Sequence, residues 1–266
     1  MQIDYNPDLA LTHEHTEAEV QNFTGSFCGF VLLKNGYNIQ TLPERLRHQY
    51  GIEMWPSHTG DVLMQDFMLD VPGAMVIISF IDLPIPDAEA EAAAVHAVWQ
   101  GAATAAQQHT AHLMIAVLPD TMPAFDAGKL YCSMISAAVD DDAVLAVYTS
   151  GTIMEPLQFR QHTEEAAALL DKLIFVGTYV REGGTCGYTV GMDAFGKDEL
   201  EILDCAGSVE TVARVLRMCA YKLIEENKAA GWYTAIEVDG AVWEGRRKDG
   251  VMVEGHSLQL KTAPAE

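Results

Sequence analysis

The sequence has few basic residues relative to its acidic ones. It contains 16 Lys and Arg against 38 Asp and Glu, which gives a net charge of −22 and an isoelectric point near 4.6. A negative field of this size repels nucleic acids and anionic lipids, whereas it attracts cationic partners. We therefore expect neither a nucleic-acid partner nor a membrane partner, and we expect any partner protein to be basic.

The sequence also lacks the motifs that mark common catalytic sites. It has no G-x-x-x-x-G-K-[ST] loop for phosphate, no G-x-S-x-G or S-x-x-K nucleophile, and no H-E-x-x-H pair. The histidine pairs His13 with His15 and His109 with His112 would each need further ligands before they could hold a metal ion. We therefore predict no catalytic residues, no metal site and no cofactor.

Disulfides, a signal peptide and a membrane span are not indicated either. The five cysteines are an odd number without C-x-x-C spacing, which is typical of proteins in a reducing cytosol. Residues 1–24 have neither the basic segment nor the apolar segment of a signal peptide. The longest apolar stretch, residues 74–83, is too short to cross a bilayer. The sequence therefore predicts a cytoplasmic protein.

The chain of 266 residues is long enough for one large domain or two lobes, and its acidity is uneven. The first 150 residues contain 19 acidic and 4 basic residues, a net charge of −15, and the remainder has −7. A partner selected by charge would meet the first lobe, although an acidic surface also simply keeps a protein soluble. The expected organisation is a leader (1–22), an acidic α+β lobe (23–150), a connecting helix (151–172) and a C-terminal α+β lobe (173–262).

Alternating strand and helix patterns predict an α+β fold with mixed, largely antiparallel sheets packed with helices. The Ala-rich segment from Asp87 to about Gln108 is expected to be one long helix. Near the end of the chain, Asp239-Gly240 and Asp249-Gly250 are typical of hairpin turns. We accordingly expect a meander that ends in a strand at Val251–Val253.

The stretch Gly187–Ile202 combines three glycines with an acidic cluster between two segments of strand length. Its glycines permit positive φ or close backbone approach, so the stretch predicts a sharp bend in a sheet. Two interpretations fit these residues. Either Cys186, Asp193, Lys197 and Glu199 form a charged ligand site on this loop, or the loop is a tight connection whose charges are solvated.

The run from Tyr188 to Ile202 (YTVGMDAFGKDELEI) resembles the signature of the bacterial domain of unknown function 4261 family, in which GM-x-x-FGK-x-E-[LI]-E-[IL] precedes a helix. The similarity covers about residues 170–240. Farther upstream, Gly29–Leu33 resembles the N-terminal strand of the family. The resemblance implies a bacterial cytosolic protein without an established catalytic set. Some relatives lie near secreted-toxin loci, which implies an immunity role.

Two features are candidates for partner binding. Trp55 begins an expected rigid loop, Trp55-Pro56-Ser57-His58, where its ring could anchor an interface or cover the edge of the core. Asp140, Asp141 and Asp142 form the densest negative patch of the chain. Such a run is normally a solvated turn between a helix and a strand. In a toxin inhibitor it could instead mimic the phosphates that a basic active site binds.

These observations favour a non-catalytic bacterial immunity protein, or antitoxin, that neutralises a cognate secreted toxin by covering a basic active site. A first alternative is an enzyme or a small-ligand sensor with its site at the Gly187–Ile202 loop. A second alternative is an adaptor or chaperone of a secretion apparatus, which would bind its cargo away from the cargo's active site.

Overall fold

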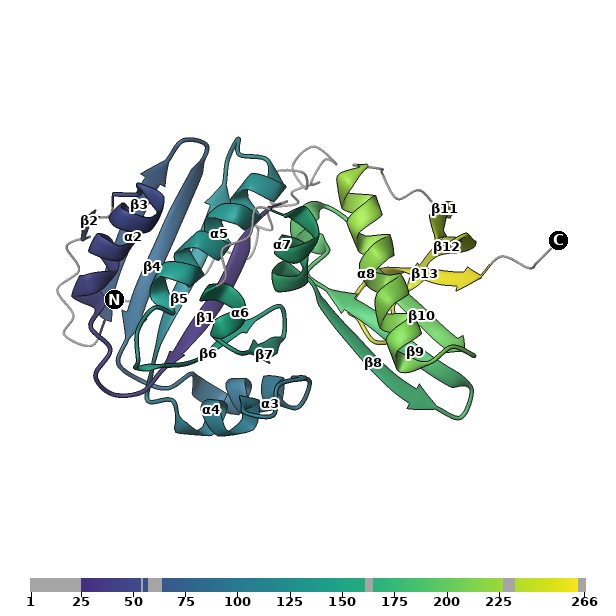
Figure 1. The fold of residues 1–266 in the computed structure, drawn as a ribbon, viewed down its shortest axis with the longest axis horizontal. Helices are drawn as coiled ribbons and strands as arrows, with labels where there is room; N and C mark the ends of the chain where they lie inside the picture. Colours follow the sequence, from purple (N-terminus) through teal and green to yellow (C-terminus); the bar gives the residue numbers. More distant parts are fainter. Residues whose placement is uncertain (1–24, 54, 57–63, 161–164, 227–232, 263–266) are drawn as a thin grey trace, which may run out of the picture.

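Two lobes, each built on its own β-sheet, make up the computed structural model (Figure 1). The structure describes residues 25–53, 55–56, 64–160, 165–226 and 233–262. Both sheets are mostly antiparallel and are packed with helices, so the predicted α+β fold is confirmed. None of the helices in these ranges is both long and apolar enough to pass through a bilayer.

The N-terminal lobe contains a seven-stranded sheet with the strand order β2-β3-β4-β5-β1-β6-β7. Every neighbouring pair in it is antiparallel. The strands are β1 Phe27–Leu33, β2 Trp55–Pro56, β3 Met64–Val71, β4 Ala74–Ile81, β5 Ala111–Pro119, β6 Val144–Thr149 and β7 Thr152–Met154. Because β1 lies inside this order and is covered on both faces, nearly all of its residues are apolar.

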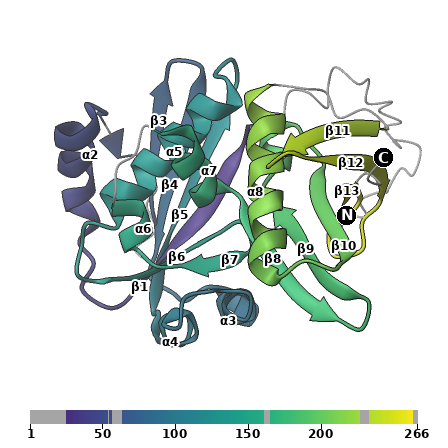
Figure 2. The ribbon, with the colours of Figure 1, turned by 45° about the vertical axis from the view of Figure 1, so that its right-hand side comes forward.

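The side chains of β1 alternate between two cores on opposite faces of this sheet. Val31 and Leu33 lie in the larger core, whereas Leu32 lies in the smaller one. The helices on the larger core include α2 Leu42–Tyr50 and α5 Ala124–Ala138, which pack against each other. The smaller core is covered by α3 Glu89–Ala94 and α4 Ala102–Gln108. The first lobe is therefore a three-layer arrangement, as Figures 1 and 2 show.

A glycine in β1 lets a buried tyrosine reach the sheet. The hydroxyl group of Tyr131, on α5, occupies the space that a Cβ atom at Gly29 would need. This hydroxyl donates a hydrogen bond of 2.9 Å to Oγ1 of Thr149 on β6. Tyr131 has no exposed surface, and its polar group is satisfied inside the core. Gly29 is therefore required by the close approach of a side chain.

The Ala-rich segment that begins at Asp87 is not the single long helix that its composition predicts. It forms the short helices α3 and α4, which are separated by residues 95–101. Asp87 has a φ of 58°, outside the helical region, and Val98 is 91% exposed rather than on a buried stripe. The interruption contains valine, histidine, tryptophan and glycine, which are weaker helix formers than alanine. Within it, the ring of Trp99 packs over Gly101.

The segment expected as a connecting helix over residues 151–172 is also not a single helix. β7 pairs with β6, so the first sheet extends beyond the boundary predicted at residue 150. Two helices follow, α6 Leu157–Arg160 and α7 Ala166–Leu173. A three-residue edge strand has too few residues to show a periodic pattern, which is why the sequence gives no signal for β7.

The C-terminal lobe contains a six-stranded sheet with the strand order β11-β12-β13-β10-β9-β8. Among its described strands, β10 and β13 pair in parallel and the other neighbouring pairs are antiparallel. The strands are β8 Phe175–Arg181, β9 Gly184–Val190, β10 Glu199–Cys205, β11 Tyr233–Val238, β12 Ala241–Asp249 and β13 His256–Thr262. Its long helix, α8 Val209–Glu225, covers the face of the sheet that is turned toward the first lobe (Figure 2).

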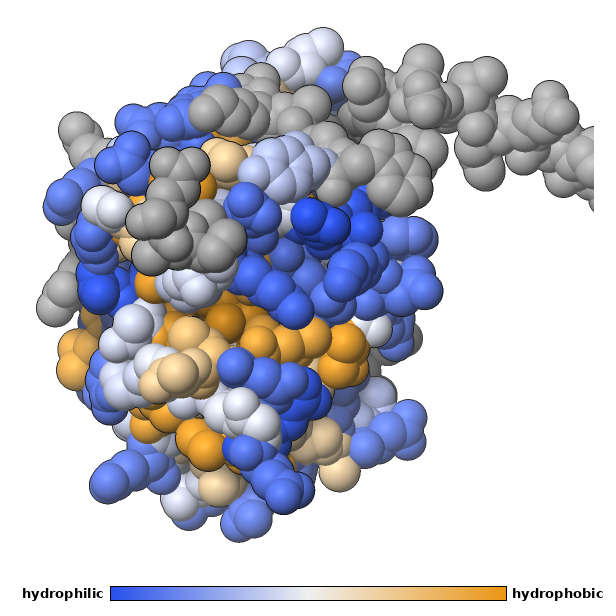
Figure 3. Space-filling view, turned by 90° about the vertical axis from the view of Figure 1, so that its right-hand side faces the viewer, coloured by the Kyte–Doolittle hydropathy of each residue, from blue (hydrophilic) through white to orange (hydrophobic). Residues whose placement is uncertain are grey.

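Ser208, followed by apolar residues at steps of three and four from Val209 to Leu223, predicts a capped amphipathic helix. The structure confirms the cap and the buried stripe except at Val209, which is exposed. The Ser208 hydroxyl accepts a hydrogen bond from the N–H of Thr211, so it caps the helix. Val212, Leu216 and Cys219 are all buried at steps of three and four residues. Figure 3 shows the opposite, outer face of this lobe, where hydrophobic residues gather between hydrophilic ones. The exposed apolar side chains of the lobe include Val242 and Met252.

The predicted turn at Asp239-Gly240 is confirmed. Both residues have positive φ, 52° and 76°, and they connect β11 to β12 as a tight hairpin.

The two lobes contact each other through aromatic side chains. Phe27 of β1 lies edge-on to Phe195, with 5.5 Å between ring centroids. The lobes therefore share part of the larger core.

β12 and β13 form an antiparallel hairpin at Asp249, where one was predicted, but its connection is longer than a two-residue turn, and the predicted strand at Val251–Val253 is wrong. Residues 250–255 form a longer loop between β12 and β13, closed by a hydrogen bond from the N–H of Gly250 to the carbonyl of Gly255. The carboxylate of Glu201 on β10 accepts the N–H groups of Val251 at 2.9 Å and Met252 at 2.6 Å. These backbone donors are thus satisfied without a strand ladder.

Candidate functional site

The acidic turn Asp140, Asp141 and Asp142 follows the C-terminus of α5, where the helix dipole disfavours negative charge. Two arginines offset this. Arg45, on α2, donates to the carbonyl oxygen of Asp140 at 2.6 Å, and Arg160, on α6, donates to the carbonyl oxygen of Val139 at 3.0 Å. Cations from two neighbouring helices therefore bind the carbonyl groups that directly follow α5 and fix the turn.

The three aspartates of the turn are not equivalent. Asp141 is half-buried, and its carboxylate accepts the N–H of Ala143 at 2.9 Å and lies 3.7 Å from a guanidinium nitrogen of Arg45. This side chain stabilises the turn. Asp140 and Asp142 are exposed. The carboxylate of Asp140 accepts a long hydrogen bond of 3.3 Å from the amide of Gln49.

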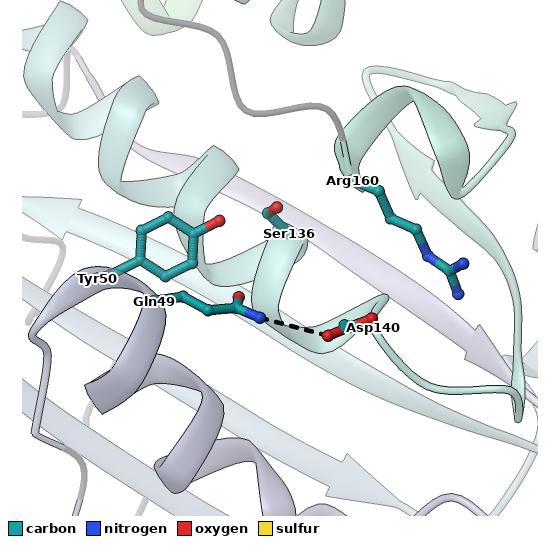
Figure 4. Close-up of a pocket in the computed structure, with 5 residues that line it drawn as sticks. All are labelled: Gln49, Tyr50, Ser136, Asp140 and Arg160. Atoms are coloured by element: carbon teal, nitrogen blue, oxygen red, sulfur yellow. Dashed lines mark hydrogen bonds between the residues drawn. The ribbon is translucent and has the colours of Figure 1, made fainter.

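A cavity of about 490 Å³ opens beside Asp140. Figure 4 shows the residues that line it, which come from the end of α2, from α5 and from α6. They are Gln49, Tyr50, Ser136, Asp140 and Arg160. A carboxylate, an amide, a hydroxyl and an aromatic ring around one hollow can receive a cationic side chain, because the carboxylate supplies charge and the ring face attracts cations. Arg160 also lines the hollow, which limits how negative it is.

Sequence reasoning identified Asp140 but none of the other residues around this cavity. One signal was present: an acidic run directly after a helix C-terminus needs a nearby cation. The first 150 residues contain only four basic residues, so Arg45 could have been named as one of few candidates.

Trp55, the other predicted partner-binding residue, does not lie in a loop. It lies in β2, an edge strand in which it pairs with Met68 of β3. Ser57 and His58 lie outside the described residues. Four strands separate β2 from β6, the strand that follows the acidic turn. Neighbouring strands lie about 4.8 Å apart, so the structure does not place Trp55 and Asp140 in one compact patch of the sheet.

The glycine-rich loop turns the carboxylate of Glu199 inward. Glu199 accepts the N–H of Gly191 at 2.7 Å, the N–H of Met192 at 2.9 Å and the hydroxyl of Thr189 at 2.6 Å. Burial raises the pKa of Glu199, and these hydrogen bonds offset part of that increase. Gly191 has a φ of 113°, which confirms that the loop uses positive φ. Glu199 therefore supports the bend.

The other carboxylates near this loop are also engaged. Asp198 forms two hydrogen bonds with the guanidinium of Arg247, at 2.7 and 3.1 Å. Glu201 is fully buried, and besides the two backbone N–H groups of the 250–255 loop it accepts the hydroxyl of Ser257 at 2.7 Å. Both carboxylates join strands or loops of the second sheet to one another. They do not face a common site.

Cys186 is fully buried. Its sulfur accepts the N–H of Asp204 at 3.3 Å, and the carboxylate of Asp204 forms a two-pronged ion pair with Arg181 at 2.6 and 2.7 Å. Among its described polar neighbours there is no histidine that could take the thiol proton. The remaining predicted ligand residues differ in exposure: Asp193 is exposed and Lys197 is half-buried.

The histidine pairs give no metal site in the described residues. His13 and His15 lie outside them. His109 is buried, donates from Nδ1 to the carbonyl oxygen of Ala106, and accepts the N–H of Ile85 at 2.8 Å. His112 donates to the carbonyl oxygen of Leu83 at 2.8 Å. Both histidines thus anchor the segment after β4, and no cluster of three or more metal-ligating side chains occurs in the described ranges.

Comparisons with known proteins do not assign this chain to a group. No family model matches it, and neither the curated proteins nor the solved structures include a significant match. The resemblance of residues 188–202 to the domain of unknown function 4261 signature therefore stays a prediction.

Proposed function

We propose that this chain is a non-catalytic bacterial immunity protein of the cytosol that binds and neutralises a basic secreted toxin. The observation that carries the proposal is the acidic turn at the mouth of the cavity between α2, α5 and α6. Asp140 and Asp142 are exposed there, in a lobe whose first 150 residues have a net charge of −15. A basic partner would be attracted to this lobe from a distance.

The contacts around the turn support a role in rapid association. Arg45 and Arg160 bind carbonyl groups, so they hold the turn in one conformation while the carboxylates of Asp140 and Asp142 stay exposed. A preformed acidic surface needs little reorganisation when a partner arrives, which favours fast binding. A lysine or arginine of the toxin would enter the cavity beside Asp140 and contact the ring of Tyr50. This insertion would cover the basic site of the toxin.

The first experiment is capture of a partner by the tagged full chain from its native lysate, at low and at moderate salt. We expect one basic protein that still binds at moderate salt but associates more slowly. The captured protein is then expressed alone and together with this chain. Growth arrest by the partner alone, relieved by co-expression, supports the proposal. If the partner is harmless or no partner is captured, the proposal is wrong.

A matched set of variants locates the interface. Replacing Asp140 and Asp142 together by Asn should lower the association rate about tenfold at low salt, because two steering charges are lost. Asp249, which is exposed on the second lobe, provides the control. Asp249→Asn removes an acidic charge far from the turn and should leave the association rate within about twofold of that of the unaltered chain. Equal effects of both changes would exclude the acidic turn as the contact surface.

A further inference from the structure

A second cavity, of about 530 Å³, lies where the two lobes meet. The first lobe contributes Trp99, Gln158 and strand β7 to its lining, and the second contributes β8 and Arg217 of α8. Figures 1 and 2 show β7 on the side of the first lobe that is turned toward the second. Small molecules bind preferentially in cavities of this size between lobes or domains.

The charges that line this cavity differ in sign from the rest of the chain. Lys172 and Arg217 contribute two positive charges, and Asp171 contributes one negative charge. Asp171 and Arg217 form an ion pair with 3.5 Å between Oδ1 and Nε, and both are more than half exposed. The whole chain has a net charge of −22, so the charge of this lining has the opposite sign. The cavity therefore favours an anion, whereas most of the surface repels anions.

The remaining surface of the cavity is largely apolar, with two aromatic rings. Trp99 is held against Gly101, and Phe175 lies edge-on to Tyr188 with 6.1 Å between centroids. The other apolar lining residues include Met154, Ile174 and Val176. Aromatic rings held by neighbouring packing offer faces and edges against which a flat apolar group can stack at low entropic cost.

Neutral polar groups complete the lining. The amide of Gln158 can donate and accept hydrogen bonds at the cavity, whereas the hydroxyl of Thr152 is buried beneath the lining and has no hydrogen-bond partner among the described residues. Burial lowers the pKa of Lys172. The ammonium group of Lys172 lies over the ring of Phe159, 6.0 Å from its centroid, and a carboxylate in the cavity would add an oppositely charged partner.

We propose that the cavity between the lobes binds a small aromatic carboxylate, with its carboxylate group at Lys172 and Arg217 and its ring between Trp99 and Phe175. The site is separate from the acidic turn and does not depend on the proposed toxin. The chain would then respond to a metabolite class as well as to a protein partner.

The first test is titration calorimetry on the full chain with three probes of one size. 2-Naphthoate carries the proposed charge, 2-naphthalenemethanol is neutral, and 2-naphthylmethylammonium is cationic. We expect one saturable site for 2-naphthoate and about tenfold weaker binding of the alcohol, since a charge-assisted hydrogen bond is lost. The ammonium probe should bind most weakly. Equal binding of all three probes, or no saturable binding of 2-naphthoate, would overturn the proposal.

Variants then locate the bound anion. Lys172→Met keeps the length of the side chain and should weaken 2-naphthoate binding about tenfold. Lys129→Met, on α5 in the first lobe, is the control and should change nothing. Asp171→Asn should strengthen binding about twofold to fivefold because it removes the one acidic group of the lining. A misfolded variant would not bind 2-naphthoate more tightly than the unaltered chain. Tighter binding by Asp171→Asn therefore supports the assignment even if Lys172→Met is misfolded. Unchanged affinity in both cavity variants would refute the assignment.

Discussion

The hydroxyl of Thr189 donates to Oε2 of Glu199 across 2.6 Å and at the same time accepts the N–H of Leu200 at 2.8 Å. Thr189 is fully buried, so this pair connects β9 to β10 at the base of the glycine-rich loop. With the N–H groups of Gly191 and Met192 also bound to Glu199, one carboxylate accepts three hydrogen bonds at the start of the bend. The pair indicates that Glu199 maintains the fold.

The structural role of Glu199 predicts a loss of stability in Glu199→Ala. Three donors would lose their acceptor, which should lower the free energy of unfolding by about 3 kcal/mol. Glu199→Gln retains an acceptor oxygen for the two backbone N–H groups, so it should cost about 1 kcal/mol. Urea unfolding measures both values, with the exposed residue Asp193→Ala as control. A ligand site at this loop predicts the opposite, a normally folded Glu199→Ala, and that result would favour the loop as a binding site.

The close approach of Tyr131 to Gly29 predicts energetic coupling between them. Gly29→Ala would place a methyl group against the phenol oxygen and against the backbone of β6, which should cost about 2–3 kcal/mol. Tyr131→Phe alone should cost about 1 kcal/mol, because Thr149 loses its hydrogen-bond partner. The double variant lacks the phenol oxygen, so part of the clash disappears. Its loss of stability should therefore be smaller than the sum of the two single losses. A double-mutant cycle with a coupling near zero would show that the contact is not energetically relevant.

Burial of His112 predicts that stability falls on mild acidification. Its pKa is lowered from the ordinary value of 6.5, chiefly because burial disfavours the charged imidazolium. Below about pH 6.5 the unfolded chain therefore binds more protons at this residue than the folded chain does, and stability decreases until the pH falls below the folded pKa. Urea unfolding between pH 7.5 and about 5.5 measures the slope.

His112→Asn retains a donor for the carbonyl oxygen of Leu83 but does not titrate in this range. The slope of stability against pH should become smaller in this variant. His96→Gln, at an exposed position, is the matched control and should leave the slope unchanged. If His112→Asn and the unaltered chain lose the same free energy on acidification, His112 does not cause the effect.

Local sequence patterns were enough to predict the elements that are stabilised by contacts between residues close together in the sequence. The stripe of α8, its cap at Ser208 and the hairpin at Asp239-Gly240 each depend on residues a few positions apart. Elements decided by distant contacts could not be predicted. The 250–255 loop has its form because Glu201, about 50 residues upstream, accepts its N–H groups. The acidic turn is held by Arg45, which lies 95 residues before Asp140.

The candidate sites also separate into features that a local sequence pattern indicates and features that depend on distant contacts. The run of three aspartates identified Asp140, Asp141 and Asp142 as an acidic patch, and the structure exposes Asp140 and Asp142 but half-buries Asp141. The two cavities gather residues from several separate segments, so no spacing in the sequence could reveal them. The charged residues of the glycine-rich loop looked like a site because the sequence does not show that Glu199 and Glu201 point inward.

The hairpin of β6 and β7 offers a final prediction, because two threonines that pair across it differ in one respect. Thr149 and Thr152 are directly opposite each other, and both are buried. The hydroxyl of Thr149 receives the hydrogen bond of Tyr131, whereas that of Thr152 has no partner within the described chain. An unsatisfied buried hydroxyl costs about 1–3 kcal/mol. Thr152→Val keeps the branched shape that strands favour and should therefore raise the free energy of unfolding by about 1 kcal/mol.

Thr149→Val is the matched control, since it makes the same chemical change one cross-strand position away. It removes a satisfied hydroxyl and leaves the phenol of Tyr131 without its acceptor, so it should lower the free energy of unfolding by about 1–2 kcal/mol. Opposite signs of the two changes in the free energy of unfolding would confirm that the Thr152 hydroxyl is unpaired in the folded protein. A loss of stability in Thr152→Val would mean that water or another group satisfies this hydroxyl.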